Sequence, residues 1–302
     1  MSKNSTFTVA CALCVGADPE PYLPATLASI ADAVDVLVVN DNSGLARSEN
    51  LAALEASAFA ARGALRVERH AFVDFADMRN RAFAALAGLP AAPDWVLFLD
   101  ADEVHGEQLR SIARDVLPRL GPQYGHLDAF TYHFWGTFGW ITDIARRFVF
   151  YRYAPGLHWT NAVHEKIAGL DGAAVVLPYV YHHYGNVQTP AALTRKHLRY
   201  HDLGNPVPRP PAIDEADASL YLAKAAQVRP FQGRHPLAAR AVLEGIAARH
   251  AAAFAELDAG FRARRSPAIR AAGSLRALNE TLRVQLRRLQ HPGLSPWPSE
   301  AR

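Results

Sequence analysis

Three short apolar runs, each followed by a polar turn, constrain the fold of this chain more than any other feature. They cover residues 8–15, 35–39 and 95–99. A further short strand is predicted at 64–69, and helical spacing of apolar residues fills the gaps, at 20–33, 50–61 and 75–86. Buried strands that alternate with helices favour a mainly parallel sheet covered on both faces. We therefore expect an α/β fold with its ligand site beyond the carboxyl ends of the strands.

The remainder of the chain predicts a second region. With 302 residues, the chain exceeds the usual size of a single hydrophobic core. Residues 128–184 are rich in aromatic side chains and suit mixed strands and binding loops. Four prolines between 206 and 211 indicate a boundary, and helical patterns follow it. The predicted domains are a catalytic α/β domain at 1–205 and a helical C-terminal region at 206–302.

Charge is informative mainly near the C-terminus. The formal net charge is only +3, so we expect no nucleic-acid partner, but arginines gather after residue 262. The last helical stretch carries leucines at three- and four-residue spacing, at Leu275, Leu278, Leu282, Leu286 and Leu289. We expect this stripe to dock on the catalytic domain. A homodimer coil ranks second, and a basic helix lying on a membrane surface ranks third.

The only two cysteines, Cys11 and Cys14, have the CxxC spacing of thioredoxin-type redox sites. They lie inside an apolar strand rather than at a helix start, so we interpret them as buried core residues. The N-terminal residues lack a signal core, and no apolar run approaches the roughly 20 residues that span a bilayer. We expect a cytoplasmic protein, with peripheral contact to the inner face of the membrane through the basic C-terminal helix as an option.

An acidic segment follows the apolar run 95–99. Asp100 and Asp102 would project to the same side of an extended backbone, and carboxylate oxygens suit Mg²⁺ or Mn²⁺. Such an ion could hold a diphosphate, and we expect Asp102 to be exposed. A calcium loop is excluded because the required glycine and further oxygen ligands are missing. Two alternatives stay open: a haloacid-dehalogenase-like phosphatase, and a solvated acidic loop that caps a helix starting near Gly106.

Four blocks together resemble family 2 glycosyltransferases of the GT-A fold. They are TVACALCVGA with PYLPATLASI, then VDVLVVNDNSG, FADMRNRAFAAL and WVLFLDADEV. A later block, RRFVFYRYAPGLHWTNAVHEKI followed by YHHYG, is similar to the acceptor half of a bacterial subgroup. The order and spacing of the blocks, over residues 8–190, make the resemblance specific. It implies a GT-A-like, Rossmann-like sheet.

The resemblance also implies a nucleotide site. Asp41 would recognise the base, uracil by preference, beside the backbone of Val15 and Gly16 and next to Asn40, where many relatives carry another acid. The alternative for Asp41 is an Asx turn that bonds only local backbone. Two further residues would bind the sugar donor. Arg79 would contact the diphosphate, and Asp100 would contact the ribose or act through a water molecule. For Arg79 the alternative is an ordinary exposed helix arginine.

The same comparison implies the metal and its ligands. Asp102, with Asp100, matches the DxD motif, and His183 matches a late histidine that would complete the shell and favour Mn²⁺. A hydrogen-bonded or core histidine is the alternative for His183. The cofactor we expect is thus Mn²⁺ or Mg²⁺.

The acceptor half supplies the catalytic candidates. Glu165 is the candidate base, with Asp143 as its rival, and an ion pair with a nearby cation is the structural alternative. The cations in question are Arg146, Arg147 and Lys166. Side chains that could shape the acceptor pocket are Trp140, Trp159 and His164.

The predicted activity is metal-dependent, inverting transfer of a sugar from a nucleotide-diphosphate donor, by preference a UDP-sugar. The acceptor would be a glycan, a lipid-linked glycan or a peptide. Two other functions compete with this prediction: the phosphatase named above, and a non-catalytic carbohydrate-binding protein on the same fold.

Overall fold

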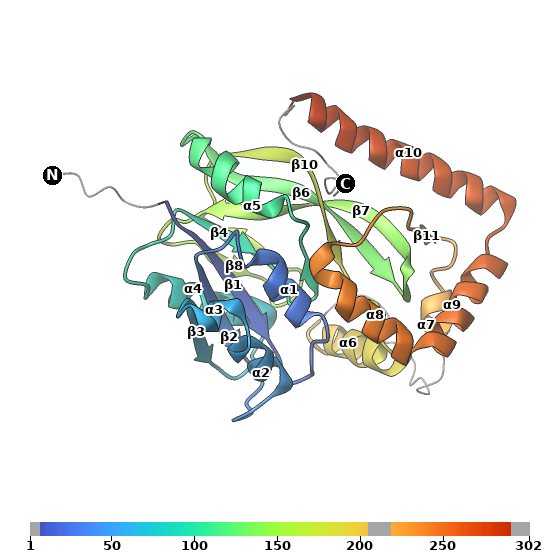
Figure 1. Ribbon diagram of the computed structural model, residues 1–302, viewed down its shortest axis with the longest axis horizontal. Coiled ribbons are helices and arrows are strands. Elements are labelled where there is room, and N and C mark those ends of the chain that lie inside the picture. Colours follow the sequence, from blue (N-terminus) through green and yellow to red (C-terminus); the bar gives the residue numbers. More distant parts are fainter. Residues whose placement is uncertain (1–6, 205–218, 291–302) are drawn as a thin grey trace. The chain divides into compact units, whose positions relative to one another are not determined.

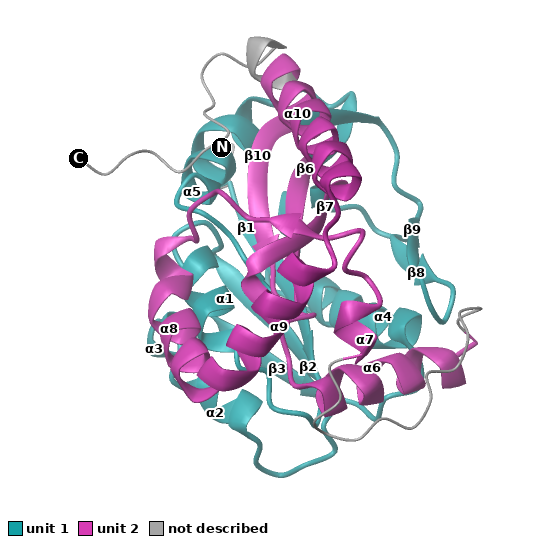
Figure 2. Ribbon diagram, turned by 90° about the vertical axis from the view of Figure 1, so that its right-hand side faces the viewer, with its two compact units in different colours: residues 1–128, 148–176 teal, residues 129–147, 177–302 magenta. Residues whose placement is uncertain are grey.

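The computed structural model describes residues 7–204 and 219–290, with side chains up to residue 286. Two compact units divide the chain (Figure 2). Unit 1 comprises residues 1–128 and 148–176, and unit 2 comprises 129–147 and 177–302. The chain crosses between the units inside three long strands, so the division does not follow the predicted boundary near residue 205. The proline cluster on which that boundary depends lies outside the described residues.

Unit 1 holds the parallel part of the main sheet (Figure 1). Its strands and helices, in chain order, are β1 (Val9–Val15), α1 (Leu23–Ile30), β2 (Val36–Asp41), α2 (Glu49–Glu55), α3 (Ala58–Ala61), β3 (Leu65–Arg69), α4 (Phe75–Ala87), β4 (Trp95–Phe98), β5 (Glu103–Val104) and α5 (Leu109–Ser111). A π-turn at Ile112–Val116 and a 3₁₀ turn at Leu117–Arg119 follow, and a small hairpin pairs β8 (His158–Thr160) with β9 (Lys166–Ala168).

The sheet order is β3-β2-β1-β4-β7-β6-β10-β5. β1 pairs in parallel with β2 and β4, and β2 with β3, whereas β7 runs antiparallel to β4. Ala10 of β1 packs on the α4 side of the sheet, while its neighbours Val9 and Cys11 are also fully buried. Successive strand residues point to opposite faces, so the sheet is covered on both faces. The predicted α/β fold, with a mainly parallel sheet flanked by helices, is confirmed.

Helix starts in unit 1 follow local chemistry. The side chains of Ser48, Ser57 and Asp74 accept hydrogen bonds from backbone N–H groups in the first turns of α2, α3 and α4. Such caps satisfy donors that have no partner inside a helix. Because Asp74 fixes where α4 begins, it also fixes which residues of that helix face the carboxyl ends of β1 and β2.

Unit 2 contains parts of the three long strands and the helices of the C-terminal region. The strands are β6 (Tyr124–Trp135), β7 (Thr137–Arg152) and β10 (Ala173–His183), with β11 (Arg229–Pro230) paired to β7. The helices are α6 (Pro190–Asp202), α7 (Ser219–Leu222), α8 (Arg240–Arg249), α9 (Ala251–Ala263) and α10 (Pro267–Gln290), with a 3₁₀ turn at Leu237–Ala239. The predicted helical C-terminal region is confirmed. No helix among the described residues is long and apolar enough to cross a membrane.

Two predictions about apolar residues have different outcomes. Both cysteines are free thiols; Cys11 is buried and Cys14 partly buried. Burial raises the pKa of both thiols, that of Cys14 to about 12, in agreement with the interpretation of both as core residues. The predicted docking of the leucine stripe is wrong: Leu275 is 68% exposed, and α10 packs through Glu280 and Val284 instead.

A buried histidine, His105, and a partly buried one, His235, are expected to make the stability of the fold depend on pH. Burial lowers the pKa of His105 from 6.5 to about 3, and burial lowers that of His235 to about 4 despite a backbone hydrogen bond at Phe138. The unfolded chain therefore takes up protons at higher pH than the folded chain. We expect full stability above about pH 6.5 and a progressive loss toward pH 4, measured as the urea midpoint. His235→Gln should flatten this dependence, whereas the same change at the exposed His158 should leave it unaltered.

Candidate functional site

The carboxyl ends of β1 and β2 lie side by side and bring together the residues predicted to bind a nucleotide. Val15 pairs in register with Asp41, and Cys14 with Asn40. The backbone N–H of Asn42 donates to the Val15 carbonyl over 2.8 Å, which closes the end of the strand pair. The predicted proximity of Val15, Asn40 and Asp41 is therefore present in unit 1.

The loop after β1 is fixed by a residue that the sequence analysis missed. Asn50, at the start of α2, is 2% exposed. Its amide nitrogen donates to the carbonyls of Gly16 at 3.0 Å and Asp18 at 2.9 Å, and its oxygen accepts from the Glu20 N–H at 2.7 Å. An asparagine at the start of a helix carries no signal of such a role in the sequence. Its effect is to set the backbone of Gly16, one of the predicted binding residues.

Asp41 is the last residue of β2 and is buried, with 2% exposure. Its Oδ1 accepts from the Ser43 N–H at 2.9 Å, so the Asx turn named as the alternative is present. Its Oδ2 lies 3.8 Å from Nε of Arg69, too far for a hydrogen bond. Oδ2 is buried and receives no hydrogen bond from the described residues. One carboxylate oxygen thus shapes the turn, and the other is an acceptor without a donor.

The two asparagines that flank Asp41 repeat this pattern. The amide nitrogen of Asn40 donates to the Met78 carbonyl over 2.7 Å, and that of Asn42 donates to the His70 carbonyl over 2.8 Å. The side-chain oxygens of both residues are buried and receive no hydrogen bond from any described residue. Buried acceptors normally have donors, because leaving one unsatisfied costs about 1–3 kcal/mol. Three consecutive residues at this strand end therefore carry buried oxygens that receive no hydrogen bond from the described residues.

The acidic segment after β4 forms a turn rather than an extended strand. The N–H of Glu103 donates to the Asp100 carbonyl over 3.1 Å, and the Glu103 carboxylate accepts from the Asp100 N–H over 3.1 Å. The Ala101 carbonyl accepts from the Thr26 hydroxyl over 2.9 Å. The expectation that the two aspartates share one side of an extended backbone is therefore wrong, because the chain closes a turn at this position.

Burial also corrects two expectations about this turn. Asp102 is only 9% exposed and Glu103 is fully buried, so Asp102 is not an exposed acid and the segment is not a solvated loop. Asp100 retains a side-chain exposure of 31%. No group of three or more histidine, cysteine or acidic side chains converges on one point in residues 7–204 and 219–286. The carboxylates that the protein itself could offer to an ion at this turn are thus those of Asp100 and Asp102. The other ligand oxygens would come from a bound substrate or from water.

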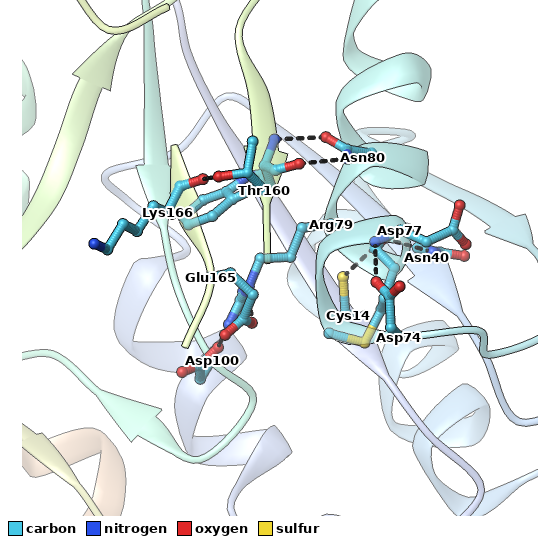
Figure 3. A network of polar contacts seen from close by, with 12 residues as sticks. Cys14, Asn40, Asp74, Asp77, Arg79, Asn80, Asp100, Thr160, Glu165 and Lys166 are labelled. Atoms are coloured by element: carbon cyan, nitrogen blue, oxygen red, sulfur yellow. Dashed lines mark hydrogen bonds and ion pairs between the residues drawn. The ribbon is translucent and has the colours of Figure 1, made fainter. Parts of the chain in front are cut away.

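A buried cation organises the same end of the sheet (Figure 3). Arg79 of α4 has a side-chain exposure of 13%. Its Nη2 donates to Asp100 over 2.9 Å and its Nε donates to Glu165 over 2.8 Å. The guanidinium carbon lies 4.6 Å from the centroid of the Phe98 ring and 5.1 Å from that of Trp159. Arg79 thus joins the acidic turn after β4 to the loop between β8 and β9, over a floor of two aromatic rings.

This arrangement decides between the interpretations given for Arg79 and Glu165. Burial lowers the pKa of Arg79, but Asp100, Cys14 and Glu165 raise it by more, so the guanidinium stays charged. An exposed helix arginine is excluded by the 13% side-chain exposure. Glu165 does form an ion pair, yet its partner is Arg79 and not one of the nearby cations that the sequence suggested.

Asn80, next to Arg79, makes a second connection between α4 and the β8–β9 hairpin, beside the ion pair of Arg79 with Glu165. Its amide nitrogen donates to the Trp159 carbonyl over 2.9 Å, and its oxygen accepts from the Trp159 N–H over 2.7 Å. Trp159 is 4% exposed and packs with Phe83 and Phe98 in the core of unit 1. The consecutive pair Arg79 and Asn80 therefore positions the segment that carries Glu165.

The loop between β8 and β9 has an irregular backbone that presents its side chains. Asn161 and His164 adopt positive φ values of 69° and 57°. Residues other than glycine in this region are uncommon and tend to occur where surrounding structure holds them. His164 is exposed, while Glu165 beside it is turned inward to Arg79. The predicted acceptor residues Trp159 and His164 thus lie in one loop region, with the tryptophan in the core and the histidine in solvent.

The remaining candidates belong to unit 2. Asp143 is exposed on β7 and accepts from the Thr142 hydroxyl over 3.0 Å. His183 lies 3.1 Å from His133, measured between their Nδ1 atoms. Trp140 is 2% exposed, and its indole N–H donates to Asp258 in the helical core of the unit. These positions give Trp140 a packing role and His183 a histidine partner within its own unit.

Comparisons with known proteins found no matching family model and no matching curated protein. Among solved structures, the crystal structure of residues 1–349 of S. aureus TarS matches 42% of this chain at 15% identity and a TM-score of 0.32. Glucosyl-3-phosphoglycerate synthase from Mycobacterium tuberculosis, in complex with Mn²⁺, UDP and glucosyl-3-phosphoglycerate, matches 41% at 19% identity and a TM-score of 0.29. The chain spans only 36% and 44% of these two structures.

Proposed function

We propose that this chain is a glycosyltransferase that binds a nucleotide-diphosphate sugar at the carboxyl ends of β1, β2 and β4. The observation that carries the proposal is the buried carboxylate of Asp41 at the end of β2, whose Oδ2 receives no hydrogen bond from the described residues. A uracil ring offers an N–H donor that Asp41 Oδ2 could accept, and a charge-assisted hydrogen bond of this kind is strong when buried. The resemblance of the sequence blocks to family 2 enzymes supports the same assignment.

We propose the acidic turn as the place where a divalent ion binds together with the phosphates of the donor. Mg²⁺ is usually bound by one or two carboxylates together with substrate phosphates, and Asp102 and Asp100 are two such carboxylates at one turn. Mn²⁺ accepts the same oxygen ligands. When bound, the ion would neutralise charge on the diphosphate leaving group. We propose Asp102 as the principal ligand, because Asp100 also holds Arg79. His183 as a further ligand stays a prediction.

The chain's own residues would prepare the acceptor. We propose that Glu165 takes the proton from the acceptor hydroxyl as it attacks the anomeric carbon, which gives inversion in a single displacement. Its Oε1 is held by Arg79, so the second oxygen would receive the proton. Since both Nε and Nη2 of Arg79 bind carboxylates, we assign Arg79 to positioning Glu165 and Asp100 rather than to gripping the diphosphate. Asp143 remains the rival base, and acceptor contacts at His164 and Trp159 remain predictions.

Calorimetry with UDP, GDP and CMP, first with Mn²⁺ and then with EDTA, tests the proposal. We expect UDP alone to bind, with Mn²⁺ required. Asp41→Ala should weaken UDP at least about tenfold, because it removes the acceptor for the base. Asp32→Asn, an exposed acid just after α1, is the matched control and should bind like the parent chain.

The competing functions predict other results. A phosphatase would release phosphate from simple monoesters without any acceptor. A carbohydrate-binding protein would bind sugars but would neither hydrolyse nor transfer a donor. Failure of all three nucleotides to bind would contradict the transferase.

A further inference from the structure

The outer face of α10 is an apolar stripe that the described residues of unit 2 do not cover. Four leucines that are three or four residues apart are exposed: Leu275 by 68%, Leu278 by 57%, Leu282 by 51% and Leu286 by 61%. The other large exposed apolar side chains of the described residues are scattered over three segments, at Leu45, Phe72, Val73 and Leu237. Single exposed leucines need no explanation, but a stripe along one helix face does.

A buried ion pair fixes which way α10 is turned. Glu280 is 9% exposed and pairs with Arg229 of β11, and its carboxylate also accepts from the Ile144 N–H over 3.3 Å. Val284, one turn further along the same face, is 1% exposed. At 100° per residue, this face lies opposite the leucines. The leucines therefore point outward because the opposite face is held in unit 2.

The charges of α10 are also almost all positive. The sequence of α10 contains five arginines and a single acid, Glu280. That acid is already neutralised by Arg229. Arg270 and Arg283 are exposed, on opposite flanks of the leucine stripe. Apolar residues in the middle with arginines at the edges are the pattern of a helix lying in the interface of a membrane, where the leucines enter the acyl region and the arginines reach lipid phosphates.

A second copy of this chain fits the stripe less well. The exposed parts of four leucine side chains offer a smaller area than the roughly 800 Å² per partner of a standard interface. Packing two such helices together would also bring like charges close. An anionic surface has the opposite charge and can accept the whole stripe.

We propose that α10 binds the surface of a bilayer that contains anionic phospholipids, with its leucine face inserted and its arginines on the headgroups. The helix lies along the surface in this arrangement. The proposal does not depend on the proposed transferase activity, because lipid binding needs no substrate.

Co-sedimentation of the full chain with vesicles tests this. We expect binding to vesicles of phosphatidylcholine mixed with phosphatidylglycerol, weaker binding at high salt, and little binding to phosphatidylcholine alone. The double variant Leu278→Ser/Leu282→Ser should bind at least about tenfold less, since each leucine buries a full side chain in lipid. Leu237→Ser, which changes a leucine that is 54% exposed outside α10, is the matched control and should bind like the parent chain.

A charge variant separates the two contributions. Arg270→Gln/Arg283→Gln should weaken binding to the anionic vesicles about tenfold and reduce its salt dependence, while leaving the weak binding to neutral vesicles unchanged. The proposal is overturned if the chain does not bind anionic vesicles, or if the double leucine variant binds them as tightly as the parent chain does. A dimer in solution that the leucine variant dissociates, without vesicle binding, would also overturn it and assign the stripe to self-association.

Discussion

Replacement of Arg79 by methionine should lower the free energy of unfolding by about 3 kcal/mol, the low end of the cost of removing one partner from a buried ion pair. Methionine keeps an apolar stem over the rings of Phe98 and Trp159. What it removes is the charge that compensates Asp100 and Glu165, whose side chains are 31% and 14% exposed. Urea unfolding at pH 7 measures the effect.

The matched control is Arg81→Met on the same helix. Arg81 is 49% exposed and pairs with Asp77 at i,i+4 spacing. A surface pair of this kind contributes only about 0.3–0.5 kcal/mol. Equal stability of the two variants would contradict the role given to Arg79.

A rescue variant tests the cause of the loss. If the lost stability comes from uncompensated carboxylates, neutralising them in Arg79→Met/Asp100→Asn/Glu165→Gln should restore more than half of it. A triple variant that is less stable than Arg79→Met would instead mean that the carboxylates hold the turn and the hairpin by other contacts.

The strands of unit 1 could be predicted because their signal is local. β1, β2 and β4 are continuous apolar runs, and a parallel sheet that is buried on both faces requires such runs. Once the strands are known to be parallel neighbours, their carboxyl ends must meet. The resemblance to family 2 enzymes implied that Val15 lies beside Asp41, and the two residues are paired in the register of β1 and β2.

The Arg79 network could not be predicted in the same way. Arg79 and Glu165 are 86 positions apart, and their contact depends on a hairpin that Asn80 fastens by two backbone hydrogen bonds. Nothing in the local sequence separates a helix arginine that faces two carboxylates from one that faces water. The burial of Asp102 was missed for a related reason, because the segment 100–103 folds into a turn that only its own hydrogen bonds reveal.

The leucine stripe of α10 shows a different limit. Spacing of three and four residues predicts an amphipathic helix, and α10 is one. The pattern says nothing about which face meets the protein. The pair between Glu280 and Arg229, from segments 51 residues apart, sets that orientation and turns the leucines outward.

The second large effect is expected from Asp102→Asn, which should reduce sugar transfer about 100- to 1,000-fold. The loss reflects the several kcal/mol that a bound ion contributes to a transition state with a charged leaving group, at about 1.4 kcal/mol for each factor of ten. Because Asp102 is only 9% exposed, the isosteric asparagine is a better test than alanine, which would leave a cavity. UDP release from a panel of UDP-sugars with Mn²⁺ measures turnover, and calorimetry measures the accompanying loss of Mn²⁺-dependent UDP affinity.

Asp115→Asn supplies the control, since Asp115 is an exposed acid in the π-turn just after α5 and should tolerate the change. Unchanged urea midpoints for both variants would show that the effect of Asp102→Asn is on the site and not on folding. If Asp102→Asn retained turnover, the assignment of the metal to this turn would be wrong. Nucleotide binding at Asp41 would still be tested separately by Asp41→Ala. Asp41 ends β2 and Asp102 follows β4, so the two variants test different parts of the site. A transferase predicts both the loss of turnover in Asp102→Asn and the loss of UDP binding in Asp41→Ala. A simple nucleotide-binding protein predicts only the loss of UDP binding in Asp41→Ala.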